Sequence, residues 1–183
     1  MANRRRGEVP LTLGHERYTL CLTLGALAEL EDALGAGDLA GLAERFASGR
    51  LAARDVIALL GAALRGGGHA LDDEAVARLP LDGGLGAVTA ALGEALVAAF
   101  GEAPHGPLIL TGRHAPETPV SAFPWDAVLA LGLSTLRWRP RDLWAATPCE
   151  LAAAAGLIRP SPDAPSRADL DRLLAAHPDP GVL

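Results

Sequence analysis

Lysine is absent from this chain of 183 residues, and aromatic residues and cysteines are scarce. All 16 basic residues are arginine, which fits a GC-rich coding bias and carries no functional conclusion. The two cysteines, Cys21 and Cys149, lie far apart and form neither a disulfide framework nor a zinc pattern. We therefore expect a reducing, cytoplasmic environment, with both thiols acting as small buried hydrophobic groups.

Long apolar runs are also missing, since no stretch of about 18 uncharged apolar residues occurs. The chain begins with Arg4-Arg5-Arg6 and Gly7-Glu8 rather than with an apolar signal core. Neither export nor a membrane partner is therefore expected. The formal net charge of -6 is the opposite of the basic balance that phosphate neutralisation needs, so no nucleic-acid partner is expected either.

Sequence motifs for catalysis and for metal binding are absent. Gly83-Gly84-Leu85-Gly86 lacks the Lys-Ser/Thr that would follow in a phosphate loop, and it is better explained as the lead-in to a helix. The two closest histidines, His105 and His114, fall in a segment rich in proline and glycine, which does not hold ligands in a fixed tetrahedral geometry. We expect no enzymatic activity, no cofactor and no metal.

The chain does have abundant apolar residues, which make up half of the sequence and are mostly alanine and leucine. Such side chains favour helices, because they lose little freedom there. Residues 8–13 and 17–22 instead alternate polar with apolar positions around Gly14-His15-Glu16, which predicts a β-hairpin with Pro10 on an edge strand or at a bulge. The expected fold class is α+β, mainly helical, with the hairpin followed by a helical bundle.

Helical periodicity with start and stop signals predicts five helices after the hairpin. They run from a Thr23 cap to Gly35, from Asp38 to near Gly49, from Ala52 to Arg65, from Asp72 or Asp73 to near Leu79, and from Leu85 to Phe100.

Residues 101–122 have a different composition, with several prolines and glycines and few periodic apolar positions. This pattern predicts a poorly packed linker between two separately folding units. The predicted division is 1–100 for a hairpin-plus-helices domain, 101–122 for the linker, 123–156 for a small all-helical module, and 157–183 for a proline-rich segment with a C-terminal helix.

The helical module concentrates all three tryptophans and carries its own helix start signals. Pro124 and Pro140 suit the first turns of two helices, and Thr147-Pro148-Cys149-Glu150 forms a capping box for a third that Gly156 ends. Ser166 is expected to cap one more helix, from Arg167 to about Ala176.

The same module resembles the small phage tail assembly chaperone family. The matching positions are Phe123, Pro124, Trp125, Asp126, Gly132, Leu133, Leu136, Pro140, Trp144, Thr147, Pro148, Glu150 and Leu151. The C-terminal helix is expected to lie outside this resemblance.

The first domain looks like a tail-protein family of gene transfer agents, which are phage-like particles encoded in bacterial chromosomes. The similarity runs from Arg4-Arg5-Arg6-Gly7-Glu8-Val9 through the hairpin to Asp32 and covers about residues 1–100. Members of that family look like assembly chaperones too. The two resemblances imply a transient role in which one module coats the tape measure protein and another recruits tail tube subunits.

The tryptophans are expected to have different roles. Trp125 and Trp144 are predicted to pack in the core of the small module, because so short a unit needs large aromatic side chains. Trp138 stands between Arg137 and Arg139, so we expect it to be exposed and these three residues to form a partner-binding patch.

Together these patterns favour a non-enzymatic tail assembly chaperone that binds tape measure or tail tube proteins, or both, by taking helices into a groove. The alternative is a structural minor tail protein, a terminator or connector, that stays in the particle. A third hypothesis, a DNA-binding regulator acting through residues 4–6, is disfavoured by the net charge. The sequence does not indicate an oligomeric state.

Overall fold

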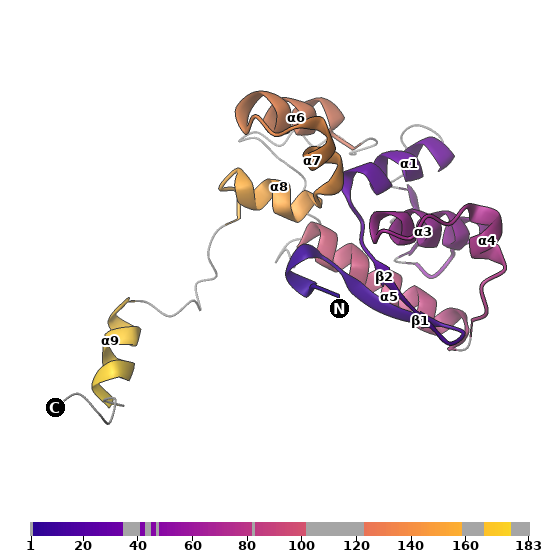
Figure 1. Cartoon of the computed structure of the whole chain (residues 1–183), viewed down its shortest axis with the longest axis horizontal. Helices are drawn as coiled ribbons and strands as arrows, with labels where there is room; N and C mark the ends of the chain where they lie inside the picture. Colours follow the sequence, from indigo (N-terminus) through magenta and orange to yellow (C-terminus); the bar gives the residue numbers. More distant parts are fainter. Residues whose placement is uncertain are drawn as a thin grey trace.

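A computed structural model describes residues 2–34, 41–42, 45–46, 48–81, 83–101, 123–158 and 167–176. The fold is mainly helical with one two-stranded antiparallel sheet near the N-terminus (Figure 1), which confirms the expected fold class. The elements are the 3-10 turn η1 (Arg4–Arg6), strands β1 (Val9–Leu13) and β2 (Glu16–Leu20), helices α1 (Leu24–Leu34), α3 (Ala53–Gly66), α4 (Asp73–Ala77), α5 (Gly84–Phe100) and α6 (Trp125–Leu129), the π-helical turn η2 (Ala130–Thr135), and helices α7 (Pro140–Ala145), α8 (Pro148–Ala154) and α9 (Arg167–Ala176).

The predicted hairpin is confirmed. Val9 pairs with Leu20 and Leu13 with Glu16, so Gly14, at a φ of 63°, lies in the tight turn between the strands. Alternation places the apolar side chains of β1 on one buried face. Strand β1 lies beside α5 (Figure 1), and its buried side chains form one wall of the core.

Helices α1, α3 and α5 supply most of the other side chains of this core. Two glycines at the end of α3 let the helix approach β2 very closely. A Cβ on Gly67 would lie 1.8 Å from the carbonyl oxygen of Thr19, and one on Gly66 would lie 2.1 Å from that of Cys21. Only glycine fits at such a contact, so the Gly66-Gly67 pair fixes how α3 packs on the hairpin.

Local start signals place the helices where the sequence predicts them. Thr23 caps α1, since its Oγ1 accepts the N–H of Ala26 at 3.1 Å, and Asp72 caps α4 by accepting the N–H of Ala75 at 2.7 Å. The expected helix end at Gly35, half of the helix from Asp38, the linker at 102–122 and the Ser166 cap lie outside the described residues.

A second core joins the C-terminal helices to α1. It contains the buried side chains of Leu24, Val128, Leu143 and Leu151. Leu24 is the first residue of α1, and it is 0% exposed. We call described residues 2–101 the N-terminal unit and 123–158 the C-terminal unit. The C-terminal unit therefore completes its core with a side chain from the N-terminal unit.

Further contacts hold the two units together. The N–H of Leu24 donates to the carbonyl oxygen of Ala146 at 2.8 Å, and the indole N–H of Trp125 donates to the carboxylate of Glu31. The ring of Phe100 meets that of Phe123 edge-on, with centroids 6.4 Å apart. The two units therefore dock on each other through α1 and α5, whereas the expectation that they fold separately stays a prediction.

The first C-terminal helix changes its winding partway. After α6 the chain continues into the π-helical turn η2, in which the N–H of Leu136 donates to the carbonyl oxygen of Leu131 at 2.9 Å. This turn was not predicted. It places Gly132 inside, against α7, and leaves Leu133 exposed.

Candidate partner-binding surfaces

The capping box that opens α8 has the geometry predicted for it. The N–H of Glu150 donates to Thr147 Oγ1 at 3.2 Å, and Glu150 Oε2 accepts the N–H of Thr147 at 2.9 Å. Pro148 occupies the first turn, where no intrahelical donor is needed. Thr147 is only 1% exposed and Leu151 lies in the second core, so these motif positions build the fold rather than a contact surface.

Gly132 is a motif position with a packing role. A Cβ there would lie 2.5 Å from Leu143 Cδ1 and 3.0 Å from Cδ2. Leu143 is fully buried, on the α7 helix that Pro140 opens. The glycine therefore allows η2 and α7 to pack closely.

The opening motif places aromatic rings at the joint between the units. The ring centroid of Trp125 lies 4.6 Å from that of Phe123 and 5.9 Å from that of Trp144. Phe123, Pro124 and Trp125 are partly buried, whereas Asp126 is exposed on the first turn of α6. This aromatic row supports the docking of the units.

The structure reverses the burial expected for two tryptophans. Trp138 is partly buried and packs against the second core, whereas Trp144 is exposed at 37%. On α7, Leu143 takes the inward position, and the adjacent Trp144 is turned away from the core. The predictions of a core position for Trp144 and of exposure for Trp138 are therefore wrong.

Residues 137–139 form the short connection between η2 and α7. The backbone N–H of Trp138 donates to the carbonyl oxygen of Gly132 at 3.0 Å, and its indole packs against the second core. Arg137 and Arg139, on either side, are both exposed. The two arginines remain a candidate contact surface, and the inward Trp138 anchors them. No contact with a partner has been observed at these residues.

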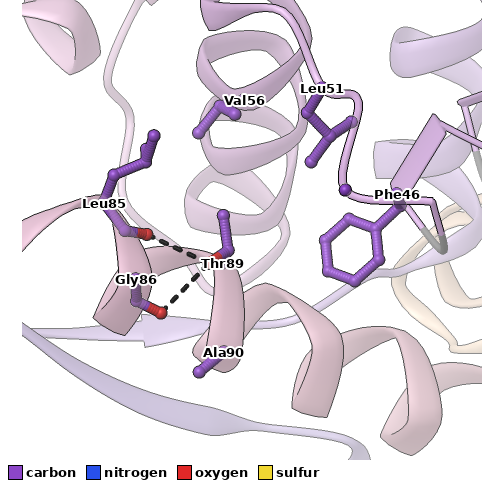
Figure 2. Close-up of a pocket in the computed structure, with 8 residues that line it drawn as sticks. Phe46, Leu51, Val56, Leu85, Gly86, Thr89 and Ala90 are labelled. Carbon is purple, nitrogen blue, oxygen red and sulfur yellow. Dashed lines mark hydrogen bonds between the residues drawn. The ribbon is translucent and has the colours of Figure 1, made fainter.

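A second candidate surface is an open groove in the N-terminal unit, with a volume of about 430 Å³ (Figure 2). It lies between the start of α3, the segment before it, and the first half of α5. The groove is lined by Phe46, Gly49, Leu51, Val56, Leu85, Gly86, Thr89 and Ala90. The sequence did not predict this groove, because its lining joins two stretches, 46–56 and 85–90, that are far apart in the chain.

The groove offers apolar contacts and almost no hydrogen bonding from side chains. Its one polar side chain, Thr89, directs its hydroxyl to its own helix, with Oγ1 lying 3.1 Å from the carbonyl oxygen of Leu85 and 3.0 Å from that of Gly86 (Figure 2). Leu85 is exposed at the rim. Such a surface suits apolar side chains of a protein partner better than a polar small molecule.

The buried ionisable groups have structural explanations. Asp55 is 2% exposed, and its Oδ2 accepts the N–H of Ala52 at 3.0 Å and lies 3.3 Å from Nε of Arg45. It therefore closes the N-terminus of α3. Burial, followed by the charges of Glu8 and Glu150, raises the pKa of the Cys21 thiol to about 11. A thiol with so high a pKa is a poor nucleophile at neutral pH.

Within the described residues, no three histidine, cysteine or acidic side chains are grouped in a way that could hold a metal ion. No helix in this part of the chain combines the length and the apolar character needed to cross a membrane.

Comparison with known proteins assigns both parts of the chain to phage tails. Residues 6–102 match the family model described as phage tail tube protein, GTA-gp10, and residues 123–180 match that of phage tail assembly chaperone protein, TAC. Neither the curated proteins nor the solved structures give a match. The second match continues through α9, so the expectation that the C-terminal helix lies outside the resemblance is wrong. Because the first match covers more than half of the residues, the chain belongs to the family of the phage tail tube protein GTA-gp10, and it carries in addition a tail assembly chaperone domain.

Proposed function

We propose that this protein is a non-enzymatic tail assembly chaperone of a phage-like particle, a gene transfer agent or prophage. It acts in the cytoplasm and binds the tape measure protein, the tail tube protein, or both, during tail assembly. The observation that carries the proposal is the pair of tail-family matches on one chain. The docking of the two units supports it, because both surfaces are then presented to partners in a fixed arrangement.

The groove supplies a mechanism for this role. A tail component that exposes an apolar helical surface before it assembles could lay one stripe of that helix in an apolar groove. Leu85 and Ala90 line the groove from α5 and are exposed, so a partner can reach them. Binding there would hide the partner's apolar side chains until another tail subunit replaces the chaperone.

The test is to co-express the full chain with the tape measure and tail tube proteins encoded beside it and to measure capture by pull-down. Ala90→Arg places a long charged side chain in the groove and should abolish capture. Ala87→Arg is the matched control, because Ala87 is exposed on the same helix but does not line the groove. If both variants capture as much partner as the unaltered chain, the groove has no part in binding.

A second candidate function is a structural minor tail protein, a terminator or connector that stays in the particle. The family name of the larger match favours it, because a tail tube protein is a permanent part of a tail. Quantitative mass spectrometry of purified particles separates the two functions. A chaperone should be depleted from mature tails, whereas a structural component should be present at a fixed ratio to the tube protein.

A further inference from the structure

Three arginines lie at alternate positions where η2 passes into α7. They are Arg137, Arg139 and Arg141, and all three are exposed. Their Cα atoms span at most roughly 14 Å, the extended length of four residues. A single short segment of a partner can therefore reach all three guanidinium groups. We call these three residues the arginine patch.

The arginine patch has almost no acidic partner within the protein. Arg141 lies 3.3 Å from the adjacent Asp142, and both side chains are mostly exposed, so this pair is weak. Arg137 and Arg139 have no ion-pair partner among the described residues. By contrast, Arg65 on α3 is paired with two carboxylates.

The backbone beneath the arginine patch is held in place from both sides. Trp138 is anchored to the second core, and the carbonyl oxygen of Arg139 accepts the N–H groups of Asp142 and Leu143 at 2.9 and 3.1 Å. Arg137 has a φ of 54° and is the one non-glycine residue with positive φ in the described part of the chain. A fixed backbone lowers the entropy lost on binding, and strained residues of this kind gather at functional sites.

We propose that the arginine patch is a carboxylate-binding surface that recognises an acidic segment of the captured tail protein. This inference rests on the proposed function and adds the chemistry of the partner. A guanidinium group donates two parallel hydrogen bonds to a carboxylate, which gives both orientation and strength. The patch is positively charged, whereas the chain as a whole has a net charge of -6. This negative net charge disfavours a nucleic acid as the ligand. Trp138 is a positioning residue here, because its indole packs inward.

The test measures the affinity of the full chain for two probes by fluorescence anisotropy at low salt. One probe is a poly-glutamate peptide of about 20 residues, and the other is single-stranded DNA of similar length. The triple variant Arg137→Gln, Arg139→Gln, Arg141→Gln should bind the peptide about tenfold or more weakly, since three charge-assisted contacts are lost. Raising the salt concentration should abolish the difference, because the patch is exposed.

A matched control removes the same charge elsewhere. Arg4, Arg5 and Arg17 are exposed and lie in the N-terminal unit, so their triple replacement by glutamine should change the peptide affinity less than twofold. An equal loss in both triple variants would show a general charge effect and overturn the proposal, as would tighter binding of the DNA than of the peptide. Thermal unfolding of each variant excludes a loss caused by unfolding.

Co-expression with the tail proteins separates this inference from the function on which it rests. If the unaltered chain captures neither tail protein, the proposed function fails. If it captures one of them and the arginine patch variant captures the same amount in low and high salt, the acidic-partner proposal fails while the function stands. Loss of capture in the patch variant alone supports both.

Discussion

Replacing Leu24 by alanine tests whether the two units form one cooperative structure. The change removes three carbon groups from a side chain that is 0% exposed, which loses about 2.4 kcal/mol of transfer free energy. Val128, Leu143 and Leu151 lie on three helices around it and cannot fully close the cavity, which adds about 1 kcal/mol. The hydrogen bond from the N–H of residue 24 to Ala146 is kept. We expect the free energy of unfolding to fall by about 3 to 4 kcal/mol.

The assay is urea unfolding followed by two signals. All three tryptophans lie in the C-terminal unit, so their fluorescence reports on that unit, while far-UV circular dichroism reports on helices throughout the chain. If the units unfold together, the two transitions coincide. Leu24→Ala should then shift both midpoints equally to lower urea.

Leu30→Ala is the matched control, because Leu30 is buried on the same helix but packs only in the first core. In a cooperative structure it too should shift the fluorescence midpoint. The reasoning is refuted if Leu24→Ala shifts the circular dichroism transition and leaves the fluorescence transition in place. Such a result would mean that the C-terminal unit does not depend on α1.

Three other expectations follow from the packing. Gly132→Ala should lower the free energy of unfolding by about 1 to 3 kcal/mol, because its Cβ would overlap Leu143, and urea unfolding measures this. Trp138→Ala should destabilise the protein by about 2 kcal/mol and by more than Trp144→Ala, because Trp138 packs on the second core; equal effects would contradict this order. The Cys21 thiol has a pKa of about 11, so about one-thousandth of it should be thiolate at pH 8. Its reaction with a disulfide reagent should therefore be far slower in the folded protein than in denaturant, and the rate should increase as the pH rises toward 11.

Features fixed by neighbouring residues could be predicted from the sequence. The cap at Thr23 and the Thr147–Glu150 capping box each join residues three positions apart, and the hairpin requires only alternation around Gly14. The buried face of α3 follows from its helical period alone. All these features depend on residues that are close in sequence, so they could be predicted without knowing the tertiary packing.

Features that depend on packing between distant segments could not be predicted in this way. Periodicity shows that Leu24 is buried, but it does not show that Leu24 belongs to a core completed far later in the chain. The flanking arginines suggested that Trp138 is exposed. In the short non-helical connection, however, successive side chains point to opposite sides, so Trp138 points inward while Arg137 and Arg139 point outward. The widened turn at η2 leaves no clear signal in apolar spacing, so the inward position of Gly132 could not be predicted from the sequence.

The docking of the C-terminal unit on α1 has a consequence for how the chain can be divided. The described contacts between the units include those of Arg6, α1 and α5 on one side and of Phe123 and α6 to α8 on the other. Two polypeptides cut between 101 and 123 would therefore keep these complementary surfaces and could reassemble as a heterodimer. The covalent connection then acts as a tether that raises the local concentration of each half for the other. This arrangement implies that the two fragments complement each other and that the stability of the reassembled complex depends on protein concentration.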